Sequence, residues 1–211
     1  VQLSAVAEFQ EQPVLTAFGE HRAERQLAVD ERRADRFHGV QVRRGQQHRL
    51  VVEVGRNLAI TPGHVVYRNA LIEVIQYAPA TERVHRRPLV IVPPCINKYY
   101  ILDLQPANSF VRYAVAQGHT VFVISWRNVP PELGRLTWDD YLEQGVLAAI
   151  DVGKEIGGSP TVNVLGFCVG GTLLACALAV LAARRDRSVE STTLLTTMLD
   201  FADPGEIGVY I

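Results

Sequence analysis

The sequence has little cysteine and no excess of either charge. Its 211 residues carry 21 Lys and Arg against 22 Asp and Glu, a formal net charge of -1, so the overall charge attracts neither nucleic acid nor an anionic membrane. The cysteines number three, and their spacing is not that of a zinc site. We therefore expect no metal, no nucleic-acid partner and a cytoplasmic location, where thiols stay reduced.

Long uncharged runs are also scarce. Residues 165–183 are nineteen residues without a charge, about the length that crosses a bilayer. Glycines at 166, 170 and 171 interrupt the start of this run. We therefore expect a buried helix over residues 172–183 and no transmembrane segment.

Residues 1–52 form a polar, basic segment that differs from the rest of the chain. Arginines and histidines are frequent in it, but aspartates and glutamates are interspersed with them. This composition favours a disordered or solvated segment over an arm that binds RNA or another polyanion. The sequence starts at Val1 and not at a methionine, so a segment that is not native, left by a fragment boundary or a misread frame, stays open as an alternative.

From residue 53 onward, the hydrophobic pattern alternates between strands and helices. Alternation of this kind predicts an α/β fold with a doubly wound, mostly parallel sheet. Trp138 and Ile156 are expected on the buried face of the second helix. The expected strands are 71–77, 89–92, 119–125, the run before Gly166 and 191–199, and the expected helices are 106–118, 137–157 and 172–183.

Cys168 lies at the apex of a glycine-rich turn, Gly166-Phe-Cys-Val-Gly-Gly171, between an expected strand and an expected helix. The same pattern with serine is the nucleophile elbow of α/β-hydrolases, in which the glycines allow the tight turn. Cys168 is therefore the candidate nucleophile, Gly166 and Gly170 are the elbow glycines, and the backbone N–H of Val169 is a candidate oxyanion donor. Taken alone, the motif also fits a buried structural thiol.

Two further loops are expected at the same edge of the sheet, because open α/β sheets place ligands at the carboxyl ends of their strands. The first follows the strand at 89–92, where α/β-hydrolases keep the loop that supplies a second oxyanion donor. We assign that donor to the backbone N–H of Ile96, and we expect Cys95 and Asn97 to form the wall of the site. The second loop is Ser125-Trp-Arg-Asn128.

Five motifs, in one order along the chain, together resemble the polyhydroxyalkanoate synthases. The likeness covers roughly residues 53–211 and is closest to the branch that polymerises short-chain hydroxyacyl groups. The motifs are PPCINKYYILDLQP at 93–106, SWRN at 125–128, TWDDY at 137–141, GFCVGGT at 166–172 and LLTTMLDFAD at 194–203.

The resemblance implies an acyltransferase with a triad of cysteine, aspartate and histidine. Such an enzyme moves (R)-3-hydroxyacyl groups from coenzyme A thioesters onto a growing polyester, here through a thioester on Cys168. It needs no cofactor beyond its coenzyme A substrate. The resemblance also implies a homodimer in the intact enzyme, and a cytoplasmic protein that meets the polyester chain and the surface of polymer granules.

The triad is incomplete in these 211 residues. No histidine follows Cys168, the last being His119, although α/β-hydrolases place the acid and the histidine after the nucleophile. We therefore expect residues 53–211 to be the N-terminal part of the synthase domain, incomplete at its C-terminus and inactive alone. A thiol-dependent esterase or lactone hydrolase, and a non-catalytic protein that binds granules or a synthase, stay open as alternatives.

Overall fold

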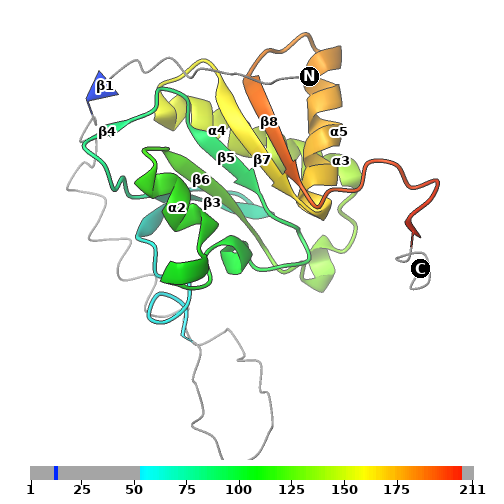
Figure 1. The fold of residues 1–211 in the computed structure, drawn as a ribbon. Coiled ribbons are helices and arrows are strands. Elements are labelled where there is room, and N and C mark those ends of the chain that lie inside the picture. Colours follow the sequence, from blue (N-terminus) through cyan, green and yellow to red (C-terminus); the bar gives the residue numbers. More distant parts are fainter. Residues whose placement is uncertain (1–11, 14–52, 206–211) are drawn as a thin grey trace, which may run out of the picture.

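The computed structural model describes residues 12–13 and 53–205 (Figure 1). The short strand β1 (Gln12–Pro13) pairs antiparallel with β4 (Arg83–Val84). The predictions made for residues 1–52 otherwise lie outside the described residues.

Six strands form one mixed sheet in the order β2-β3-β6-β5-β7-β8. Pairing is parallel among β6, β5, β7 and β8, and it is antiparallel between β2 and β3 and between β3 and β6. The predicted α/β fold with a mostly parallel sheet is confirmed, and it corresponds to part of an α/β-hydrolase fold. The strands are β2 (Gly63–Arg68), β3 (Ile72–Tyr77), β5 (Leu89–Val92), β6 (Val121–Trp126), β7 (Val162–Phe167) and β8 (Val189–Leu195).

Helices cover both faces of the sheet, as Figure 1 shows. The helix α2 (Phe110–Ala116) packs on one face, and α4 (Ala148–Gly157) and α5 (Val169–Ala183) pack on the other. Because side chains alternate along a strand, successive residues of the central strands point into two separate hydrophobic cores, one on each face of the sheet. Val90 and Val92 join the α4 and α5 side, whereas Ile91 joins the α2 side. Full burial of each such side chain contributes about 1.5–3 kcal/mol.

Short 3-10 helices connect several of these elements, and most of them precede α2. The segment expected as one helix over 106–118 begins with a 3-10 turn and becomes α-helical only after Ser109, whose side chain accepts the N–H of Arg112. The 3-10 helices are η2 (Tyr99–Leu102), η3 (Pro106–Asn108) and η4 (Pro131–Leu133).

The helix predicted from Thr137 exists, but it is built of three parts. It starts as α3 (Trp138–Asp140) with a capping box between Thr137 and Asp140, continues as a π-helix, η5 (Tyr141–Leu147), and ends as α4. The expected burial of Trp138 and Ile156 is wrong, since they are 47% and 42% exposed. Both lie in the terminal turns of the helical segment.

The last predicted strand is also displaced. A strand was expected over 191–199, but β8 covers Val189–Leu195. It ends because Thr196 adopts a positive φ of 46°, which turns the chain back toward the loop after β7. The strand β2 was not predicted, since Pro62 and Gly63 are turn signals.

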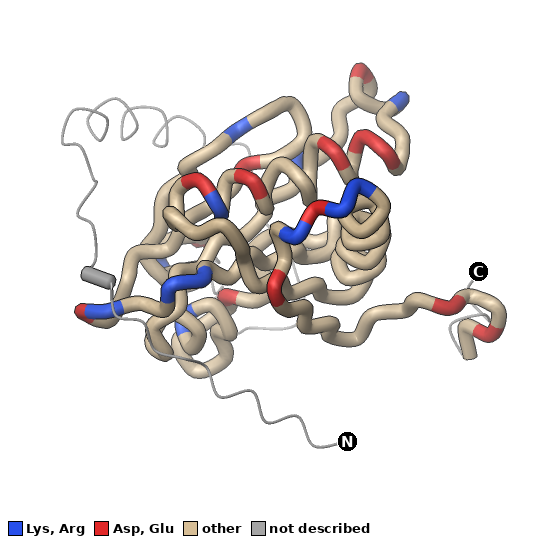
Figure 2. Tube along the Cα trace, turned by 90° about the horizontal axis from the view of Figure 1, so that it is seen from above, with Lys and Arg blue, Asp and Glu red and all other residues tan. Residues whose placement is uncertain are grey.

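Positively and negatively charged residues are interspersed along the described trace (Figure 2). A surface of mixed sign produces little long-range attraction for a polyanion or a polycation. Within residues 53–205, no helix has both the length and the apolar character needed to cross a membrane.

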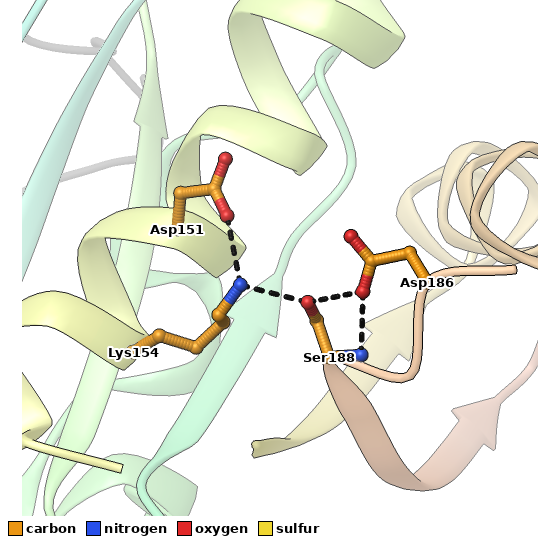
Figure 3. Close-up of polar contacts among 4 residues, drawn as sticks. All are labelled: Asp151, Lys154, Asp186 and Ser188. Atoms are coloured by element: carbon orange, nitrogen blue, oxygen red, sulfur yellow. Dashed lines mark hydrogen bonds and ion pairs between the residues drawn. The ribbon is translucent and has the colours of Figure 1, made fainter. Parts of the chain in front are cut away.

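A polar network ties α4 to the turn that precedes β8 (Figure 3). Lys154 donates from Nζ to Asp151 Oδ1 at 3.2 Å and to Ser188 Oγ at 2.8 Å. Asp186 Oδ1 accepts both the hydroxyl and the backbone N–H of Ser188. These two bonds lower the pKa of the Asp186 carboxyl, because they favour its charged form. Ser188 is 5% exposed, so the network anchors the start of the edge strand.

Ser188→Ala should lower the free energy of unfolding at neutral pH by about 1–2 kcal/mol, because it removes a buried hydroxyl that serves two partners. Since the folded pKa of Asp186 lies below its unfolded value, the part of this contribution that comes from the bond to Asp186 is complete above the unfolded pKa of about 3.9 and is lost as pH falls through the folded pKa. Urea unfolding at several pH values measures it. Ser191→Ala, in the exposed part of β8, is the control, and an equal cost in both variants would contradict the anchoring role.

Candidate active site

Cys168 occupies the turn between β7 and α5, and the predicted strand, turn and helix are present. Its backbone has φ 54° and ψ -127°, a region that costs a residue with a side chain on the order of 1–3 kcal/mol. The surrounding bonds maintain this conformation. The N–H of Cys168 donates to the carbonyl of Leu195 at 2.9 Å, and its carbonyl accepts the N–H of Gly171 at 2.8 Å.

The elbow glycines are required by close backbone contacts. A Cβ on Gly166 would lie 2.4 Å from the Cα of Gly171, and one on Gly170 would lie 2.2 Å from the carbonyl oxygen of Val92. These distances are far below van der Waals contact. The first turn of α5 therefore packs directly on the ends of β7 and β5, which fixes the position of Cys168.

Gly170→Ala should destabilise the protein by about 3 kcal/mol or more, since the obstructing atoms belong to the backbone and cannot rotate away. The midpoint of urea unfolding measures this loss. Gly134→Ala serves as the control, because Gly134 has an ordinary helical backbone and an added Cβ there would meet a single neighbour, at 3.2 Å. A cost below about 1 kcal/mol for Gly170→Ala would show that the close approach of α5 to β5 is wrong.

The loop after β5 begins beside this elbow. β5 and β7 are parallel neighbours, with Val92 opposite Gly166, so the two loops leave the same edge of the sheet. The N–H of Asn97 donates to the carbonyl of Pro94 at 3.1 Å, which places Cys95 and Ile96 at the centre of a turn. The hydrogen bond of such a turn is made by its first and last residues and not by the N–H groups of its central residues, so the Ile96 N–H is the candidate donor at this turn.

Val169 supplies the other candidate N–H. It is the first residue of α5, where backbone N–H groups have no partner within the helix and the helix dipole favours negative charge. The structure thus brings the loop of Ile96 and the helix start at Val169 to neighbouring strand ends, as the sequence predicted.

Cys95 and Asn97, which were predicted to form the wall of the site, have different surroundings. Cys95 is half-buried and packs against the core that contains Trp126. Burial raises the pKa of the Cys95 thiol, which disfavours the thiolate that a nucleophile requires. Asn97 is exposed, and the neighbouring Lys98 donates from Nζ to Asn128 Oδ1 at 2.9 Å. This bond joins the loop after β5 to the loop after β6, as their common edge predicted.

The loop after β8 is a part of the site that sequence reasoning missed. Leu195 supplies the carbonyl that accepts the Cys168 N–H, and Thr172 Oγ1 donates to the carbonyl of Met198 at 2.9 Å. A Cβ on Gly171 would lie 2.0 Å from Thr197 Oγ1. In the sequence, Gly171 was the available signal for a close contact at this point. A glycine alone, however, does not indicate which loop makes the contact.

The described histidines lie at the opposite edge of the sheet. His85 and His119 precede β5 and β6. His64 is the second residue of β2, and the pairing of β2 with β3 and of β3 with β6 places it near the amino ends of the parallel strands. The rings of His85 and His119 are 4.6 Å apart and line a cavity of about 390 Å³. Burial, aided by His85, lowers the pKa of His119. None of these three can act on Cys168 across the length of the strands.

Metal ligands do not gather at this edge. Among residues 53–205, no group of three or more His, Cys, Asp or Glu side chains could hold a metal ion.

Comparison with known proteins finds poly(3-hydroxyalkanoate) polymerases among the relatives of this chain. A family model described as the N-terminus of poly-beta-hydroxybutyrate polymerase matches residues 29–114, and so extends into the arginine-rich segment. The poly(3-hydroxyalkanoate) polymerase subunit PhaC of Cupriavidus necator is 57% identical over 159 residues, which cover 75% of this chain and 27% of that protein. The corresponding subunit of Rhizobium meliloti is 47% identical over 158 residues, covering 75% and 26%.

The chain spans about a quarter of the length of these curated relatives. Solved structures with some likeness include a sugar hydrolase from Lactococcus lactis, with 18% identity, a TM-score of 0.46 and coverage of 68% of this chain and 58% of that one. Brefeldin A esterase has 18% identity, a TM-score of 0.45 and coverage of 68% and 42%. Because these TM-scores are low, the assignment of the fold rests on the order and pairing of the strands. The family match and the 57% identity over most of the chain identify a polyhydroxyalkanoate synthase N-terminal region in this protein.

Proposed function

We propose that this chain is part of a polyester synthase in which Cys168 carries the acyl group as a thioester. The observation that carries the proposal is the strained backbone of Cys168 at the start of α5, beside the turn that contains Ile96. The names of the relatives support polymer synthesis over simple hydrolysis. A thiol-dependent esterase or lactone hydrolase would share the elbow, and analysis of the product, polymer or free acid, distinguishes the two.

The chemistry suits a thiol at this position. The Cys168 thiolate attacks the carbonyl carbon of an (R)-3-hydroxyacyl coenzyme A thioester, and the carbonyl oxygen becomes an oxyanion. The N–H groups of Val169 and Ile96 stabilise it, each contributing on the order of 3 kcal/mol. Expulsion of the coenzyme A thiolate, which then takes up a proton, leaves the acyl group on sulfur. Because one thioester replaces another, the group stays activated for attack by a hydroxyl at the end of the polyester.

The proposed cycle requires a general base near Cys168. Among residues 53–205, no histidine lies at this edge of the sheet, so the proposed triad requires a histidine from outside these residues. A cytoplasmic location, association with the polymer granule, a homodimeric intact enzyme and the absence of any cofactor other than the coenzyme A substrate belong to the same proposal. A non-catalytic role at the granule or on a synthase is the alternative if no acyl transfer occurs.

The 211-residue chain alone should show no turnover of 3-hydroxybutyryl-coenzyme A at neutral pH, because no histidine follows Cys168 in it. Release of free coenzyme A, followed with a thiol reagent, should not exceed one equivalent per chain. Sustained release beyond that amount would contradict the requirement for a further histidine.

In a longer synthase that contains this region together with its aspartate and histidine, Cys168→Ala should lower polymer formation by a factor of about a thousand or more, since it removes the nucleophile. Polymer is measured by gas chromatography of its methyl esters. Cys176→Ala is the matched control, because Cys176 packs within α5 against the core. Retained activity in Cys168→Ala would remove the proposed role of the elbow.

A further inference from the structure

The indole of Trp126 is bonded to the base of the loop that contains Ile96. Trp126 is the last residue of β6 and is 8% exposed. Its Nε1–H donates to the carbonyl oxygen of Pro93 at 2.8 Å. Pro93 is the first residue after β5, and Pro94 begins the turn that presents the Ile96 N–H.

This bond matters because the base of the loop consists of two residues without backbone donors. Pro93 and Pro94 have no N–H groups, so neither residue can donate a backbone hydrogen bond to the sheet. Attachment through hydrogen bonds must then use carbonyl groups. The indole N–H provides the donor for the first of them, in a buried position where water does not compete for it.

The same peptide group touches the elbow from the other side. A Cβ on Gly170 would lie 2.7 Å from both the carbonyl carbon and the carbonyl oxygen of Pro93. The Pro93 peptide therefore contacts the first turn of α5 as well as the indole. The position of this peptide therefore affects both the loop that contains Ile96 and the helix start that supplies the Val169 N–H.

The π-helix η5 makes room for the indole. A Cβ on Gly145 would lie 2.6 Å from Cη2 and Cζ3 of Trp126, so no other residue fits there without moving the ring. Tyr141, in the same π-helix, has its ring centre 5.5 Å from that of Trp126. π-Helical turns within α-helices are frequent at functional sites, and this one packs against the ring that holds the loop.

We propose that Trp126 is a positioning residue for acyl transfer at Cys168. Through the Pro93 carbonyl it fixes the turn that presents the Ile96 N–H beside the Val169 N–H, and Gly145 in η5 admits its ring. The role in acyl transfer rests on the function proposed above, whereas the attachment of the loop is a property of the fold and can be measured separately.

The test replaces Trp126 with Phe, which keeps an aromatic ring but removes the N–H donor. The chain has two tryptophans, so Trp138→Phe at the exposed site makes the same chemical change as a control. In the 211-residue chain, backbone hydrogen exchange of the loop at 93–102, followed by mass spectrometry, should become about 3- to 10-fold faster in Trp126→Phe and stay unchanged in Trp138→Phe.

A second readout isolates the oxyanion. Acylation of Cys168 by a 3-hydroxybutyryl thioester passes through an oxyanion, but alkylation by iodoacetamide does not. At about pH 8.5, where thiols ionise without a partner base, Trp126→Phe should lower the ratio of the acylation rate to the alkylation rate by about 10-fold. A loss of stability alone would not change this ratio selectively.

Gly145→Ala tests the same attachment with the indole retained. The added methyl group should displace the ring and speed exchange of the loop, and it should add little in a Trp126→Phe background, since the two changes act through one contact.

The outcomes separate the two proposals. Unchanged loop exchange in Trp126→Phe, or additive effects of the two substitutions, would overturn the positioning role. If Cys168 of the parent chain is alkylated but never acylated, the proposed function fails, and faster loop exchange in Trp126→Phe would still establish the attachment by Trp126.

Discussion

The architecture of this chain depends on the close approach of the first turn of α5 to the ends of two parallel strands. Gly170 meets the carbonyl groups at the end of β5, and Gly166 at the end of β7 meets Gly171. Contacts this short exclude any side chain at these positions. They place a thiol, a helix start and the loop after β5 within one edge of the sheet, and the chemistry proposed for Cys168 requires these three parts together.

The strain at Cys168 is sustained by its neighbours on three sides. The carbonyl of Leu195 holds the Cys168 N–H, Thr172 binds the carbonyl of Met198, and the Pro93 peptide lies against the first turn of α5. An unfavourable backbone conformation persists only where the surrounding structure determines it. The loops after β5 and β8 are therefore parts of one support for the nucleophile, although they are about a hundred residues apart in the sequence.

Local signals in the sequence predicted much of this edge. β5 was predicted with its observed bounds because a short β-branched run lies between a charged turn and Pro93. The glycines around Cys168 specify the elbow by their spacing. The π-helix, the bond from Trp126 and the end of β8 were not predictable in this way. Each depends on a contact between segments distant in the chain, such as Gly145 with Trp126 or Thr172 with Met198. Trp138 was assigned to the core because it falls on the apolar face of the helical pattern. The pattern does not show that side chains in the first turn of a helix can remain exposed.

The central claim is that Cys168 forms the acyl thioester. Peptide mapping by mass spectrometry after incubation with 3-hydroxybutyryl-coenzyme A at about pH 8.5, where thiols ionise without a partner base, tests it most directly. The account predicts a 3-hydroxybutyryl adduct on the peptide that contains Cys168, formed well before any on Cys95 or Cys176. An absent adduct, or equal labelling of the three cysteines, would contradict it.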